Sequence, residues 1–167
     1  MRYVLMAMIL VLTCLDLGKA QAAGDPQERE SLRGLSGLGV VIGEINPDAQ
    51  ADGLSQEAIR TAVELILRSS GIQVLTQPEL LKPPVRPYLY VQITTINSGS
   101  LYSVGLNEIL YQEVSLVRRP AHTMYAPTWS KGRVGYFNKS VVRSVVTDAV
   151  EPLTKMFAND FLAANPK

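Results

Sequence analysis

The residues that could perform chemistry in this chain are few and widely spaced. His122 is the only histidine and Cys14 the only cysteine. A zinc site built on one histidine would need several carboxylates converging on it, and none is clustered near His122 in the sequence. Serines are numerous, but no Gly-x-Ser-x-Gly elbow presents one as a nucleophile. We therefore predict no catalytic residue, no metal and no cofactor, and a hydrolase that uses His122 is the weakest alternative.

Paired carboxylates and phosphate-binding glycines fail on spacing as well. Glu108 and Glu113 are separated by an odd number of positions, so they face opposite sides of a regular strand. Three glycines at 37, 39 and 43 lie inside a β-branched apolar run rather than between a strand and a helix, and they lack dinucleotide-binding spacing. The sequence favours binding over catalysis.

Aromatic side chains with a nearby arginine are the best candidates for a binding site. Tyr125, Trp129, Arg133 and Tyr136 lie close together in the sequence. Tryptophan, tyrosine and arginine carry much of the binding energy at protein interfaces. The alternative is that these aromatic residues form cross-strand pairs that stabilise a sheet. We predict these four residues as the binding surface.

The amino terminus has the three parts of a secretion signal. A positively charged start precedes an apolar run over residues 4–15, and small residues follow up to Ala22. We expect residues 1–22 to be cleaved off, leaving a protein that works in the periplasm or outside the cell. The run is shorter than the ~20 residues of a spanning helix, so a retained anchor is a weaker alternative. Lipidation at Cys14 is also weaker, because Thr13 stands where Gly or Ala is usual.

Cleavage changes the charge balance of the protein. The full chain has 16 Lys and Arg against 15 Asp and Glu. Losing Arg2, Lys19 and Asp16 leaves 14 of each. A near-neutral protein lacks the basic surface that binds nucleic acids or anionic membranes. We expect neither partner and no stable membrane span, while the oligomeric state stays open. The only cysteine leaves with the signal, so the exported protein forms no disulfide.

The remaining residues predict one domain behind a short tether. Residues 23–34 are mostly polar and include Gly24 and Pro26, which predicts a flexible tether. Residues 35–167 are of ordinary length for a single domain that buries its own core.

The first half of this domain predicts a strand, a helix and a second strand. Residues 35–45 are β-branched and dotted with glycine, which predicts a buried strand. Ser55 caps a helix whose apolar residues recur at spacings of three and four residues, and Gly71 ends this helix. A short strand over 72–75 follows, and prolines exclude regular structure from 77–87.

The second half predicts antiparallel strands and a long helix. Strands cover 88–96 and 101–118, the second with a bulge or bend around 107–111 because of its length. A further strand covers 122–137, and Pro127 places it at a sheet edge. A helix begins near Asn138 or Ser140 and ends near Ala164, with a kink at Pro152.

This order, β-α-β-β-β-β-α, predicts an α+β two-layer sandwich. Two main helices cover one face of a largely antiparallel sheet, and the other face is left to solvent or a partner. The leading hypothesis is a non-enzymatic periplasmic interaction module, an accessory subunit of a cell-envelope complex. The alternative is a carrier that holds a small apolar ligand between the sheet and the helices.

An ordered set of motifs resembles a family of small exported bacterial proteins. The set comprises Leu32-Arg33-Gly34-Leu35, Gly39-Val40-Val41, Leu67-Arg68-x-x-Gly71-Ile72-x-Val74, Pro87-Tyr88-Leu89-Tyr90-Val91, Thr128-Trp129-x-x-Gly132-x-x-Gly135 and Asn165-Pro166-Lys167. The resemblance implies export but no activity and no functional residue. Pro152 departs from that family's pattern, which has an ordinary helix former there. The element order is also similar to the amino-terminal domain of TolB and the periplasmic part of the curli export channel, an analogy of fold alone.

Overall fold

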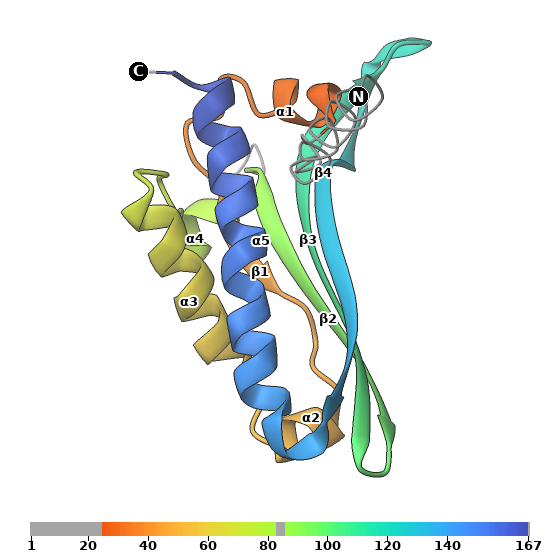
Figure 1. The fold of residues 1–167 in the computed structure, drawn as a ribbon. Coiled ribbons are helices and arrows are strands. Elements are labelled where there is room, and N and C mark those ends of the chain that lie inside the picture. Colours follow the sequence, from red (N-terminus) through yellow and green to blue (C-terminus); the bar gives the residue numbers. More distant parts are fainter. Residues whose placement is uncertain (1–24, 83–85, 167) are drawn as a thin grey trace, which may run out of the picture.

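The structure is a computed structural model that describes residues 25–82 and 86–166. It has two layers, with a four-stranded sheet on one side and the main helices on the other (Figure 1). The strands are β1 (Gly39–Ile42), β2 (Tyr88–Ser98), β3 (Leu101–Leu116) and β4 (Arg119–Asn138), in the spatial order β1-β2-β3-β4. β1 pairs with β2 in parallel, and the other two pairings are antiparallel. The predicted α+β fold with a largely antiparallel sheet is confirmed.

Two long helices form the second layer. The helices are α1 (Pro26–Glu30), α2 (Pro47–Ala51), α3 (Gln56–Ser69), α4 (Gln77–Leu80) and α5 (Val142–Ala164), the last preceded by a 3-10 turn over Lys139–Val141. α3 begins as predicted, because the Ser55 hydroxyl accepts a hydrogen bond from the Ala58 N–H. Its residues Ile59, Val63 and Leu67 are buried.

α5 supplies the larger share of the core on the helical side. Its buried residues are spaced three or four positions apart and include Val146, Val150, Leu153 and Phe157. The helix continues through Pro152 as one element, as predicted. The kink expected at this proline stays a prediction.

The long strands follow the predicted pattern. β2 buries Leu89, Val91 and Ile93 on one face. β3 has a register irregularity between Leu110 and Tyr111, within the region where a bulge was expected. β4 runs without interruption through Pro127 and forms an edge of the described sheet, which is where a proline is tolerated.

Two local predictions between α3 and β2 are wrong. Residues 72–75 form no strand, because only Val74 makes an isolated parallel bridge, to Leu38. The segment after it was expected to lack regular structure, but α4 forms there. Pro78 lies in the first turn of α4, where a backbone N–H has no partner within the helix, so the missing N–H of proline costs no hydrogen bond. Glu79 accepts a hydrogen bond from the Thr76 N–H at 2.8 Å.

The segment predicted to be a flexible tether is instead packed on the domain. Residues 26–30 form α1, and Leu32 is completely buried. Arg29 pairs with Asp160 of α5 at 3.1 Å, and the side-chain amide of Asn165 donates to the Leu32 carbonyl at 2.9 Å. The tether prediction missed these long-range contacts. The predicted signal over residues 1–22 and the first two tether residues lie outside the described residues.

Candidate functional site

The face of β2, β3 and β4 that points away from α3 and α5 has no helix over it in the described part of the chain (Figure 1). We call this surface the open face. It is formed by the side chains of β2, β3 and β4 that alternate with the buried ones. Ser103 of β3 lies between Ile96 of β2 and Tyr136 of β4 in the strand register. Val134 lies two residues before Tyr136 on β4 and faces the same side. Val134 and Tyr136 are 74% and 76% exposed, so apolar surface is presented to solvent at this end of the open face.

Four tyrosines gather at the other end of the open face. Tyr88 lies opposite Tyr111 in the β2–β3 register, and their rings stack with centroids 5.3 Å apart. The ring of Tyr125 also stacks on that of Tyr88, with centroids 6.2 Å apart. The ring of Tyr90 meets that of Tyr111 edge-on, with centroids 6.3 Å apart. All four are partly exposed. We call them the tyrosine cluster.

Two hydroxyls of this cluster, those of Tyr88 and Tyr125, are favoured in the neutral form because their pKa values are raised. Burial, together with the neighbouring Tyr111 and Tyr90, raises the pKa of Tyr88. Burial and the carboxylate of Glu113 raise the pKa of Tyr125. A neutral phenol both donates and accepts a hydrogen bond. The cluster therefore offers flat aromatic surface edged with hydrogen-bonding groups, which suits binding rather than proton transfer.

The structure separates the four residues predicted as a binding surface. Tyr125 belongs to the tyrosine cluster, and Tyr136 lies on the apolar end of the open face. Trp129 and Arg133 lie on the helical side of β4, since they pair with the buried Leu110 and Leu106. Only two of the four therefore share the open face.

Trp129 was expected at the surface and is a core residue instead. It is 1% exposed, its indole N–H donates to Asp160 at 3.0 Å, and its ring meets Phe157 edge-on at 5.0 Å. The cause is the irregularity in the β3–β4 register: Leu110 pairs with Trp129, but Tyr111 pairs with Pro127. The extra residue reverses the alternation of β4, so Trp129 and Tyr125 face opposite sides although four positions separate them.

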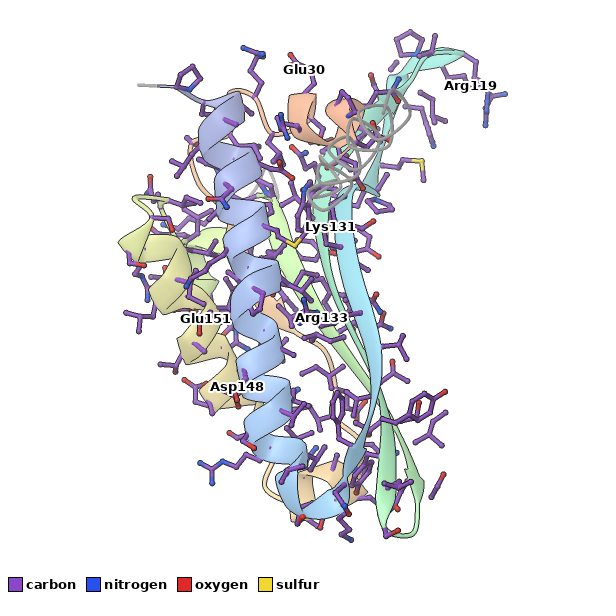
Figure 2. The ribbon with its side chains drawn as sticks, viewed as in Figure 1. Glu30, Arg119, Lys131, Arg133, Asp148 and Glu151 are labelled. Carbon is purple, nitrogen blue, oxygen red and sulfur yellow. The ribbon has the colours of Figure 1, made fainter. Side chains whose placement is uncertain are left out.

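Arg133 lies between β4 and α5 (Figure 2). It borders a small apolar pocket lined also by Gly135, Phe137, Val145 and Ala149, with a volume of about 30 Å³. Arg133 itself is exposed. Its guanidinium is therefore available at the mouth of an apolar recess beside the sheet edge.

Glu108, which its spacing from Glu113 excluded from a carboxylate pair, is a buried group. It is completely buried, and one carboxyl oxygen accepts a hydrogen bond from the Thr154 hydroxyl at 2.7 Å. The other oxygen has no hydrogen-bond partner among the described residues. Burial raises the pKa of Glu108 to about 8, although the hydrogen bond from Thr154 acts in the opposite direction. The signal was present in the sequence, because Glu108 falls in phase with the apolar residues at 102, 104, 106 and 110.

The described residues offer little for metal or ligand chemistry. No three or more of their His, Cys, Asp or Glu side chains converge on a point that could hold a metal ion. His122 lies exposed on β4. The pocket between the sheet and α5 has about 30 Å³, whereas small-molecule sites usually hold about 300 to 1,000 Å³. Two larger hollows of about 490 and 510 Å³ lie beside α4 and carry charged residues, including the Glu64–Arg68 ion pair.

No family model matches the chain, and no curated protein matches it. Among solved structures, it is similar to the PelC dodecamer from Paraburkholderia phytofirmans, with 15% sequence identity and a TM-score of 0.37. That match covers 78% of this chain and 88% of the PelC chain. Among the described residues of this chain, no helix is long and apolar enough to cross a membrane.

Proposed function

We propose that this protein is a non-enzymatic interaction module that binds another protein through the open face of its sheet. The observation that carries this proposal is that the open face holds both the tyrosine cluster and strongly exposed apolar side chains. Contiguous exposed apolar surface on a small domain is typical of an interaction site. Tyrosine contributes large contact area at a small loss of side-chain entropy, which is why it is frequent at interfaces.

The proposed place of action is the periplasm or the cell exterior, as an accessory subunit of a cell-envelope complex. The support is the signal-like pattern of residues 1–22, which lie outside the described residues, and the motif resemblance to exported bacterial proteins. Fractionation of cells that express the full chain tests export directly. A mature protein that begins at residue 23 in the periplasm or medium supports it, and an unprocessed chain in the cytoplasm contradicts it.

The ligand-carrier and hydrolase alternatives lack a supporting observation. The space between the sheet and α5 is too small for a ligand of ordinary size. His122 is exposed on β4, and the described residues show no partner that would activate it.

Site-specific photocrosslinking in cells tests the binding face. A crosslinking amino acid is placed at Tyr136 on the open face, and a matched one at Leu65, which is 66% exposed on α3 in the helical layer. We expect a discrete protein adduct from position 136 and none from position 65. The double substitution Val134→Lys with Tyr136→Lys should abolish capture from a crosslinker at Tyr90, while Leu65→Lys should not. Equal adducts from both faces, or none from the open face, would contradict the proposal.

A further inference from the structure

We propose that the outer edge of β4 accepts an extended, acidic segment of a partner protein as an additional strand of the sheet. No described strand pairs with this edge. An unpaired edge presents a row of backbone N–H and C=O groups that can hydrogen-bond an incoming strand. The inference concerns backbone pairing at the strand edge, which the proposed binding at the open face does not require.

Only part of β4 is suited to this pairing. Pro120 and Pro127 lie in the first half of the strand, where each lacks the backbone N–H that would bond an added strand. Residues 128–138 contain no proline, and we call them the acceptor segment. Its free edge begins after Ser130, because the Thr128 carbonyl already accepts a hydrogen bond from the Ser31 hydroxyl and the Ser130 N–H donates to Glu28. β1, at the other end of the strand order, has only four residues. The acceptor segment is thus the longest proline-free stretch of strand at either edge of the described sheet.

The acceptor segment has apolar surface on both sides of the sheet. On the open face lie Val134 and Tyr136, both strongly exposed. On the helical side lies the pocket of about 30 Å³ between β4 and α5. An added strand would direct alternate side chains to the two faces. One aliphatic side chain could fill the pocket while its neighbours along the strand cover Val134 and Tyr136.

Charge decides which kind of strand fits. β4 contains Arg119, His122, Lys131 and Arg133 and no acidic residue. Lys131 is already paired with Glu28 of α1, whereas Arg133 has no ion pair among the described residues. The nearby acidic residues of α5, Asp148 and Glu151, point away from β4 (Figure 2). An incoming carboxylate on the helical side would therefore find Arg133 unneutralised.

The same charges disfavour pairing of β4 with a second copy of the chain. Antiparallel self-pairing centred on the acceptor segment would bring two copies of Arg133 to the same side of the joined sheet, with Lys131 beside them. Like charges that lie directly opposite each other on paired strands are destabilising. We therefore commit to an acidic partner segment rather than to self-association.

Two short synthetic peptides of alternating threonine and valine test the proposal. One carries glutamates at its central positions, and the matched peptide carries lysines there. Binding is followed by NMR and by amide hydrogen exchange of the full mature chain. We expect the acidic peptide to bind and to slow exchange in residues 131–138 but not in the proline-containing half of β4. The basic peptide should not bind measurably.

Charge reversal at Arg133 provides the decisive control. Arg133→Glu should weaken binding of the acidic peptide by roughly fivefold or more and produce binding of the basic peptide. Arg119→Glu, on the same strand outside the acceptor segment, should leave the preference unchanged. An exchanged preference cannot come from misfolding, and the emission of the buried Trp129 confirms that each variant is folded.

Several outcomes would overturn the inference. They are equal binding of the two peptides, absence of binding at millimolar concentration, and an affinity that Arg133→Glu does not alter. Shifts confined to the tyrosine cluster would assign the peptide to the open face instead. A concentration-dependent dimer that protects residues 131–138 would assign the edge to a second copy of the chain.

Discussion

Glu108 has an environment that is unusual for a carboxylic acid. It is completely buried between β3 and α5, with Thr154 as its hydrogen-bond donor and one oxygen unpartnered among the described residues. A buried carboxylate with so few donors is strongly disfavoured, whereas the protonated acid is tolerated. Lys131 lies opposite Glu108 in the register but is paired with Glu28. The protein therefore keeps a neutral acid in its core over most of the physiological range.

Replacing Glu108 with glutamine should remove a pH dependence of stability. The pKa of Glu108 rises from 4.5 to about 8 on folding, so between these values the folded state retains a proton that the unfolded state has lost. Unfolding free energy should therefore fall by up to ~1.4 kcal/mol per pH unit as the pH rises through this interval. Glu108→Gln should flatten the slope and be the more stable protein at alkaline pH.

Urea unfolding at about pH 5 and about pH 8 measures this difference. Glu113→Gln is the matched control, because Glu113 is exposed on the other side of the same strand. An unchanged slope in Glu108→Gln would show that the carboxyl is not the group responsible.

At the scale of elements, α1 shows how a short polar segment becomes part of the domain. Pro26 starts the helix, and Asp25 accepts a hydrogen bond from the Gln27 N–H. Glu28 forms an ion pair with Lys131 of β4, and Arg29 forms one with Asp160 of α5. Asp160 also accepts a hydrogen bond from the indole N–H of Trp129. The segment thus covers the end of the core where Trp129 lies.

Trypsin digestion should reveal this packing. Cleavage after Arg29 and Arg33 should be slow in the native protein, because α1 and the buried Leu32 hold these bonds against the domain. Leu32→Ala should destabilise the protein by about 2 to 5 kcal/mol and accelerate cleavage at both sites. Mass spectrometry of the early fragments identifies the sites. Rapid cleavage of the unaltered protein at Arg29 would restore the tether interpretation.

Sequence pattern predicted those elements whose residues bury one regular face. Ile59, Val63 and Leu67 indicate α3 by spacing, and Leu89 and Val91 indicate β2 by alternation. The packing of α1 was not predictable in this way, because its contacts are with residues about a hundred positions away.

The candidate site was predictable only in part. The sequence pattern indicated an aromatic strand at β4, but it could not show where the alternation of that strand is broken. The irregularity between Leu110 and Tyr111 sends Trp129 inward and leaves Tyr125 outside. The cluster with Tyr88 and Tyr111 depends on register between strands, which no single segment reveals.

At the scale of the whole molecule, the buried apolar residues form one continuous core. It runs from Leu32 through β1, α3 and the sheet to Ala164 in α5. A domain with a single core is expected to unfold in one cooperative step.

Two independent probes should therefore report the same unfolding transition. Trp129 is the only tryptophan and is buried, so its fluorescence reports the core between β4 and α5. Far-ultraviolet circular dichroism reports all helices and strands. We expect coincident midpoints in thermal and urea unfolding. An earlier fluorescence transition would show that the α1–β4–α5 end opens separately from the rest.

The far end of the β3–β4 hairpin extends past the helical layer (Figure 1). Val117, in the two-residue connection between the strands, is 97% exposed. A fluorescent dye or short epitope tag attached at Val117 would lie at the end of the hairpin, away from the hydrophobic core. The hairpin tip is thus a practical handle for imaging the protein in intact cells without disturbing its fold.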